Sequence, residues 1–467
     1  MFRLGVLLTL IHQQSCYRNV FSPKSLRIAP SFSTATAVGA MSKIIQTLEP
    51  VPREFSSSIY VCTTPKASDD VKTALLKSTK NSVIFIPRFV SNECDIQVEA
   101  AVHWENSVLN MSDIVVFWLP GLSHEDIAEF PSLLLGTLAN SGKVIYGCVP
   151  GELKEKSLRM QLARVNSILE KNSIAVHKSL DQVMESVQSR VKDAHVMRTI
   201  GERKVPLHVW KTGAFQNWYE NIKRVGNRLD DATFEWTFRV GPQKAFVLFW
   251  VLHVNVYVAA EKRNKDNEVV ISRPDISVIL AYHRGARHRF LDTKVVLIRE
   301  FRSPARTEDG YVWELPGGSS FKPNKNIHET ARDELFEETG HKVEVDRVVY
   351  HKSRQLAATV TAHHAHLFSV ELTSAEIQDL ETKAQRGLAF GNDDETEKCY
   401  VHVETLEHLA QRCKVDWTTL GMIYSVLFSE QAKAEMQTAE IAAEEKEKNE
   451  ENMTVVKSHK STCCTIS

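Results

Sequence analysis

The stretch from Trp313 to Gly340, WELPGGSSFKPNKNIHETARDELFEETG, constrains this chain more than any other feature. Its second half carries Glu334, Glu337 and Glu338. Residues three and four positions apart share one face of a helix, so we expect the three carboxylates to form one acidic patch. Like charges this close repel each other, and a divalent cation would remove the repulsion. Because carboxylate oxygens suit Mg²⁺ or Mn²⁺, the sequence predicts a metal site.

A solvated acidic helix face is the simpler interpretation of Glu337 and Glu338, since glutamate runs are common on surface helices. It does not explain the order of the neighbouring segments. An apolar run typical of a strand, Val295 to Phe301, comes first, then ELPGG, and then a glutamate helix that ends at Gly340. This order favours a site built between a strand, a glycine turn and a helix.

The stretch resembles the Nudix box, whose usual pattern is G-x5-E-x7-R-E-U-x-E-E-x-G-U, with U a bulky apolar residue. The second half of the pattern is matched in order and spacing by Glu334, Leu335, Glu337, Glu338 and Gly340. Gly317 and Gly318 match the opening glycines, with a connecting loop one residue longer. The first Glu of the pattern falls on Lys325, the Arg on Asp333 and the last apolar residue on His341. Because the Arg normally orients the glutamates, we expect a metal site without its usual support.

The resemblance implies the roles of several residues. Glu334 and Glu338 would bind Mg²⁺, and Glu337 would be a further ligand or a base that orients water. Arg302 in REFRSP and Glu314 before LPGG resemble positions of the ADP-ribose pyrophosphatase branch, where the Arg meets the diphosphate and the Glu lies beside the substrate. The planar fork of Arg suits a phosphate. The alternative for Arg302 is a surface ion pair with a neighbouring glutamate, Glu300 or Glu308.

Two later segments offer further candidates. In the resembling family a glutamate of a late loop often serves as general base, and Glu395 or Glu397 in GNDDETEK fits that place, although a solvated turn also explains them. His364 and His366 alternate along the strand-like segment ATVTAHHAHLFSVEL and share a face. Histidines that pack in a core or edge are more common than ligands.

The first half of the chain predicts a parallel sheet. Short apolar segments, SIYVCT, SVIFIPRF, DIVVFWLP and KVIYGCVP, alternate with helical stretches, as in a sheet covered on both faces. The fragments from Ile59 to Pro150 resemble the nucleoside 2-deoxyribosyltransferase-like family, with Gly136 on its Phe-Gly position. This places Leu134 where that family has its nucleophilic glutamate, and Glu129 is five residues upstream. A leucine cannot attack an anomeric carbon, so we expect the fold and a nucleotide-sized pocket without the transferase chemistry, or a pocket filled by apolar side chains.

Composition excludes some functional classes. The 467 residues are 43% hydrophobic and 25% charged, which is ordinary for a globular protein of two or three domains. The net charge of −1 gives no strong signal for nucleic acid, which disfavours RNA 5′-pyrophosphate removal, a third function that uses the same metal chemistry. Eight cysteines without CxxC spacing argue against a disulfide framework or a zinc site.

The two ends predict different destinations. Residues before Glu49 lack acidic side chains and include scattered Arg, Lys and Ser, which resembles a mitochondrial transit peptide. The last four residues, beginning at Cys464, resemble a prenylation box, with Cys463 as a second lipid site. A start at Met41 would remove the transit-like segment, giving a cytoplasmic product anchored to a membrane by its prenyl group. Both destinations stay open.

We therefore predict an α/β and α+β fold, with an N-terminal parallel-sheet domain before a Nudix α/β/α sandwich. The predicted segments are 1–55, transit-like or unstructured; 56–195, deoxyribosyltransferase-like; 196–255, an aromatic-rich connection; 256–428, Nudix-like; and 429–467, a charged tail. The leading function is Mg²⁺-dependent (or Mn²⁺-dependent) hydrolysis of a nucleoside diphosphate derivative such as ADP-ribose. The alternative is a nucleotide-binding sensor or scaffold that has lost catalysis. The resemblance also implies a homodimer.

Overall fold

The structure is a computed structural model, and it describes most of the chain after residue 40. The described residues are 41–87, 95–128, 130–151, 155–284, 289–319, 325–391, 398–409, 411, 414–433 and 436. With the exception of Met41, they belong to the compact unit Ser42–Ser467. No helix among these residues is long and apolar enough to cross a bilayer.

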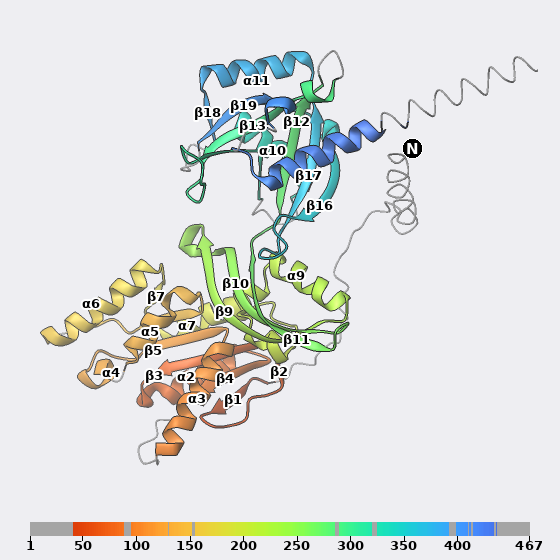
Figure 1. The fold of residues 1–467 in the computed structure, drawn as a ribbon. Coiled ribbons are helices and arrows are strands. Elements are labelled where there is room, and N and C mark those ends of the chain that lie inside the picture. The colour runs from red at the N-terminus through yellow and green to blue at the C-terminus, as the bar shows by residue number, and fades with distance from the viewer. Residues whose placement is uncertain are drawn as a thin grey trace, which may run out of the picture. The chain divides into compact units, whose positions relative to one another are not determined.

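A six-stranded parallel sheet forms the first part of the fold (Figure 1), as the alternating apolar segments predict. Its strands, in spatial order, are β1 (Lys43–Gln46), β4 (Ser82–Ile86), β3 (Ser57–Thr63), β5 (Ile114–Leu119), β6 (Val144–Cys148) and β7 (Val176–His177). Strands β3 and β5 are buried along their whole length. Such continuous apolar runs are typical of strands covered on both faces.

Helices cover both faces of this sheet. One apolar core joins the sheet to α3 (Asp95–Met111), α5 (Ser132–Leu138) and α6 (Lys156–Lys171). The other core joins it to α2 (Ser68–Ser78) and α7 (Leu180–Val191). A short helix, α4 (His124–Ala128), precedes α5. Strand β1 corrects one expectation, because Lys43–Gln46 lies in the segment predicted to be unstructured; four residues are too few to show a period in sequence.

The aromatic-rich segment predicted over 196–255 forms, together with residues up to 272, a three-stranded antiparallel sheet and two helices. Its elements are α8 (Leu207–Trp210), α9 (Gly213–Arg224), β9 (Arg228–Val240), β10 (Phe246–Val258) and β11 (Arg263–Ser272). Phe215, Trp210, Tyr219 and Trp250 pack together in a separate apolar core. Trp236 and Phe238 differ, because their side chains are exposed and stack on each other.

A buried ion pair holds the chain in place just before helix α8. Arg198 in β8 (Arg198–Thr199), which pairs with β2 (Glu54–Phe55), contacts the Asp113 carboxylate, and both side chains are inaccessible to solvent. The same carboxylate accepts hydrogen bonds from the backbone N–H groups of Ser58 and Leu207, each at 2.8 Å. Asp113 therefore ties α8 to the amino end of β5.

A mixed eight-stranded sheet forms the second part of the fold (Figure 1). Its main path is β16 (Val349–Gln355), β17 (His364–Glu371), β12 (Ile276–His283), β13 (Lys294–Phe301), β19 (Cys399–Thr405) and β18 (Ala389–Phe390). Strand β14 (Tyr311–Glu314) pairs with β13, and β15 (Gly317–Gly318) pairs with β12. A turn that includes Asp309 and Gly310 lies between β13 and β14, with φ 72° at Gly310.

This second sheet is also covered on both faces. Helices α10 (Ile327–Thr339) and α11 (Ser374–Arg386) share one apolar core with it, through residues such as Leu335 and Leu380. Helix α12 (Leu406–Leu409) and a helix over residues 417–433 share the other core, which includes Ile423 and Val426. This α/β/α sandwich and the parallel sheet before it confirm the predicted fold class.

Candidate functional site

The three glutamates on helix α10 differ in how deeply their side chains are buried. The helix begins after Asn326, whose side chain accepts a hydrogen bond from the His328 N–H, and ends at Gly340 in the left-handed conformation with φ 61°. Glu338 is buried, with 8% of its surface exposed, whereas Glu334 is half-buried and Glu337 is exposed. The helix thus directs part of its acidic face into the protein, and the fully solvated interpretation is wrong for Glu338.

Two glycines bring the backbone close to these carboxylates. The Gly317 N–H donates a hydrogen bond of 2.9 Å to Glu338 Oε2. A Cβ atom added to Gly318 would lie 2.6 Å from Glu334 Oε1, and one added to Gly317 would lie 2.6 Å from the Ser277 carbonyl oxygen. Neither position accommodates a side chain without movement, which explains the glycine pair in physical terms.

A third carboxylate, Glu300, joins the site from β13. Its side chain is buried, with 6% of its surface exposed, and its Oε2 atom lies 3.7 Å from the Cys399 thiol. That thiol also lies 3.9 Å from Glu338 Oε1. From the sequence alone, Glu300 is expected only as a surface ion-pair partner of Arg302. The missed signal is the alternation of β13, which places Glu300 on the same inward face as Val296 and Ile298.

The two candidate substrate residues contact each other. Arg302 Nη2 lies 2.8 Å from Glu314 Oε2 and 2.8 Å from Glu300 Oε2. Arg302 and Glu314 are each about one-third exposed, so solvent reaches this pair. The ion pair proposed as the alternative role of Arg302 therefore exists with Glu300. Its guanidinium also links that buried carboxylate to the partly exposed Glu314.

The two departures from the Nudix pattern form an ion pair with each other. Lys325 Nζ lies 2.9 Å from Asp333 Oδ2, with side-chain exposures of 21% and 31%. Arg332 contacts the other oxygen of Asp333 at 2.6 Å. Burial opposes ionisation of Asp333, but hydrogen bonds from Lys325 and Arg332 outweigh it and lower the pKa of the carboxyl. The two positions that depart from the pattern thus contact each other, with both charges reversed and the opposite signs kept.

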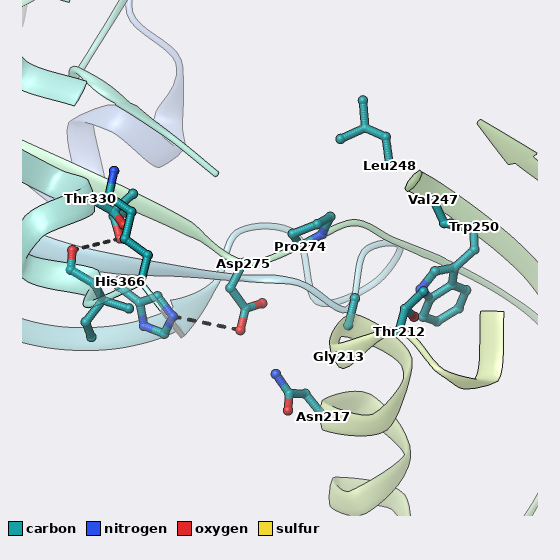
Figure 2. Close-up of a pocket in the computed structure, with 14 residues that line it drawn as sticks. Thr212, Gly213, Asn217, Val247, Leu248, Trp250, Pro274, Asp275, Thr330 and His366 are labelled. Atoms are coloured by element: carbon teal, nitrogen blue, oxygen red, sulfur yellow. Dashed lines mark hydrogen bonds and ion pairs between the residues drawn. The ribbon is translucent and has the colours of Figure 1, made fainter. Parts of the chain in front are cut away.

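Glu395 and Glu397 lie outside the described residues. His366 Nε2 contacts Asp275 Oδ2 at 3.8 Å, and Figure 2 shows this contact in a pocket that Thr330 of α10 also lines. Burial lowers the pKa of His366, so its ring is neutral at pH 7. His366 therefore matches a packed histidine held by a neighbour.

The donor set suits a hard divalent cation. No group of three or more His, Cys, Asp or Glu side chains in the described part of the chain has a ready metal-binding geometry. Even so, Glu338 and Glu334 offer oxygen atoms beside Gly317 and Gly318, and Glu300 and Glu338 both lie near the Cys399 thiol. Burial of carboxylates is costly unless cations or hydrogen-bond donors accompany them. The oxygen donors of these residues fit Mg²⁺ or Mn²⁺, whereas a softer metal prefers sulfur ligands.

The N-terminal sheet offers no nucleophile at the position indicated by its sequence resemblance. Leu134 in α5 is partly buried and packs against an apolar core, and Glu129 lies outside the described residues. Leu134 therefore contributes an apolar side chain to this part of the core.

Comparison with known proteins supports the interpretation of the second sheet. A search of curated proteins gave no match. Residues 281–419 match the model of the NUDIX domain, which spans β13, α10 and β19. Domains of this family generally use divalent cations such as Mg²⁺ and hydrolyse compounds built on a nucleoside diphosphate. The glutamates of α10, the glycine pair and Glu300 all lie inside the matched region, and this match supports the Nudix family for residues 281–419.

Proposed function

We propose that residues 281–419 hydrolyse a nucleoside diphosphate derivative in a reaction that depends on Mg²⁺, with ADP-ribose-like compounds as the first substrate class. The observation that carries this proposal is the buried Glu338 carboxylate, held by the Gly317 N–H beside a second buried carboxylate, Glu300. A purely structural helix has little reason to direct carboxylates into a domain. Their burial is consistent with a cation site.

Each residue has a defined part in this proposal. Glu338 and Glu334 would hold the metal, and Glu300 would complete its oxygen ligands. When bound, Mg²⁺ would neutralise charge on the diphosphate and acidify a water molecule. Glu337 is exposed, which leaves its carboxylate accessible to orient that water.

Arg302 would bind the diphosphate. Its guanidinium now shares hydrogen bonds with Glu314, and a phosphate would have to compete for them. Because Glu314 is partly exposed, solvent can stabilise its carboxylate when the pair opens. The same opening would free Glu314 to accept a hydrogen bond from a ribose hydroxyl. The pair therefore supports an ADP-ribose-like substrate, which offers both groups.

A substrate panel with purified full-length protein tests the proposal. The panel contains ADP-ribose, NAD, dinucleotide polyphosphates and 5′-triphosphate RNA, each with and without Mg²⁺, and products are separated by chromatography. We expect Mg²⁺-dependent release of a nucleoside monophosphate from ADP-ribose. Glu338→Gln should reduce kcat by at least about 100-fold, the typical loss when a metal-site partner or a key electrostatic group is removed.

Glu329→Gln is the matched control, since Glu329 is an exposed glutamate in the first turn of the same helix. It should retain the activity of the unmodified protein. Equal turnover by Glu338→Gln and Glu329→Gln would refute the site assignment. Saturable nucleotide binding without turnover of any compound would instead support the sensor or scaffold function.

We further infer that the N-terminal domain keeps a deoxyribosyltransferase-like fold without that chemistry. The parallel order β4-β3-β5-β6 supports the first part, and the partial burial of Leu134 against the core supports the second. Incubation with a deoxyribonucleoside and a free base should give no exchange product. Exchange that Leu134→Glu leaves unchanged would contradict this inference.

A further inference from the structure

A cluster of basic side chains lines a large cavity at the amino ends of β5 and β6, away from the carboxylates of the Nudix region. The cavity has a volume of about 860 Å³, within the range of small-molecule sites. Its basic lining residues are His177, Arg190, His208, Lys211, Arg239 and Lys244. Open parallel sheets usually bind ligands beyond the carboxyl ends of their strands, so this edge is a different location from the customary one.

The buried cations of the cluster are held by backbone carbonyls. Arg190 donates to the carbonyl oxygens of Gly142 and Val144 at 3.0 and 2.9 Å. Lys143, which is buried just behind the cavity wall, donates to the carbonyl of Asn110 at 3.0 Å. These bonds position the cations but leave their charge without a carboxylate. The cluster therefore keeps a net positive charge.

Two further groups converge on Gly142 at the cavity wall. A Cβ atom on this glycine would lie 3.0 Å from His208 Nε2 and 3.3 Å from the Arg239 guanidinium. Nε2 of His208 is inaccessible to solvent and has no hydrogen-bond partner among the described residues. The side chain of Arg239 likewise forms no hydrogen bond or ion pair with another side chain or backbone group in the described part of the chain. An unpartnered buried nitrogen beside an unpaired guanidinium is costly unless an acceptor occupies the site.

Carboxylates nearby do not neutralise the cluster. Asp113 lines the cavity, but its oxygens are occupied by Arg198 and by the backbone of Ser58 and Leu207. Glu185 also lines the cavity, and its side chain is exposed. Burial, together with the charges of Lys143, Arg239 and Arg190, lowers the pKa of His208 to about 3, so the imidazole is neutral and can donate one hydrogen bond.

Burial also lowers the pKa of Lys143 to about 8, against the attraction of Asp113, and that of Arg190 to about 10. Neighbouring cations contribute in both cases. The protein thus holds several cations together at a cost that a bound anion would remove.

We propose that this cavity binds a small molecule carrying two or more phosphate groups. Arg239 suits a bidentate contact with phosphate oxygens, Arg190 adds positive charge beside it, and the neutral His208 supplies a further donor. A multivalent anion matches several cations better than a single carboxylate does. The cavity is large enough for a nucleoside attached to the phosphates, and a ligand of oligophosphate alone has the same recognition chemistry.

Isothermal titration of the full chain with inorganic tripolyphosphate tests the site. EDTA in the buffer removes divalent cations, so that the carboxylate site cannot bind phosphate through a metal. We expect saturable binding that is at least tenfold weaker in Arg239→Gln, a substitution at a side chain with no partner to lose. Arg228→Gln, on the same strand β9 but paired with Asp230, is the matched control and should bind as the unmodified protein does.

Parallel titrations distinguish the two sources of phosphate. Tighter binding of ADP than of inorganic pyrophosphate would identify a nucleotide, and equal binding would identify the phosphates as the whole determinant. Glu338→Gln should leave each affinity unchanged, which separates this site from the proposed hydrolase. Absence of saturable binding below about 1 mM, or equal affinities in Arg239→Gln and Arg228→Gln, would overturn the proposal.

Discussion

The ion pair between Lys325 and Asp333 should stabilise helix α10, on which the candidate metal ligands lie. The pair connects the segment before the helix to its middle, over a distance of 2.9 Å. Coulomb's law at this distance gives about 1.4 kcal/mol in water and about 2.9 kcal/mol at an effective dielectric constant of 40. Partial exposure and side-chain entropy reduce this, so we expect a net coupling of about 1 kcal/mol.

The perturbation is a double-mutant cycle with Lys325→Ala, Asp333→Ala and both together. Asp333→Ala should cost more than Lys325→Ala, because Arg332 still contacts the Asp333 carboxylate after the lysine is removed. Hydrogen exchange of α10 amides in the full chain is the assay, since it reports local opening without requiring turnover. The equilibrium constant for local opening of α10 should rise about fivefold for each kcal/mol of stability that is lost.

Charge exchange gives a sharper test. Asp333→Arg alone places three cations together and should open α10 further, while Lys325→Glu combined with Asp333→Arg should restore part of the protection. An equivalent exchange of Lys223 and Glu220, an exposed pair on α9, should leave α10 unchanged. A coupling near zero, or no recovery in the exchanged pair, would refute the idea that the two departures compensate each other.

Three other perturbations have outcomes fixed by the structure. Gly318→Ala should abolish Mg²⁺-dependent turnover while circular dichroism stays unchanged, because its Cβ would displace the flexible Glu334 carboxylate; unaltered kinetics would contradict this geometry. Arg198→Leu leaves a buried carboxylate unpaired and should reduce the free energy of unfolding in urea by about 3–5 kcal/mol, and a loss below about 1 kcal/mol would show that the pair is dispensable. A hydrogen bond from Arg347 lowers the pKa of Glu376 in the folded protein to about 2. The stabilisation given by ionised Glu376 is therefore present above the pKa of this group in the unfolded chain, about 4.5, and is lost as pH falls towards 2. Glu376→Gln should therefore be less stable at pH 7 by roughly 1–3 kcal/mol but equal near pH 2, and a difference independent of pH would contradict the assignment.

The elements of the fold follow from the sequence where one physical rule dominates. Strands β3 and β5 are continuous apolar runs, and only a sheet covered on both faces can bury such strands. The end of α10 is equally clear, because Gly340 adopts the left-handed conformation that glycine accepts without strain. By contrast, β1 has only four residues and a mixed burial pattern, so no periodicity announces it.

The metal site could be predicted only in part. Spacing along one helix identifies Glu334 and Glu338, because helical geometry fixes which side chains share a face. The contribution of Glu300 depends on how β13 packs against α10, which is a tertiary contact. Cys399 comes from a strand 99 residues later in the chain than Glu300, and no local pattern places its thiol between the two carboxylates.

The charge-reversed pair shows why a pattern of residue types and a pattern of interactions can disagree. Compared with the Nudix pattern position by position, Lys325 and Asp333 are two separate losses, and each predicts a weaker site. In the structure they are one interaction, since reversal of both charges leaves their attraction unchanged. Such a reversal changes the charge that neighbouring side chains meet. Here Arg332 supplies a second cation to the Asp333 carboxylate. Activity of this domain therefore depends on whether the glutamates are positioned, and the hydrogen bond from Gly317 to Glu338 does not require the family's arginine.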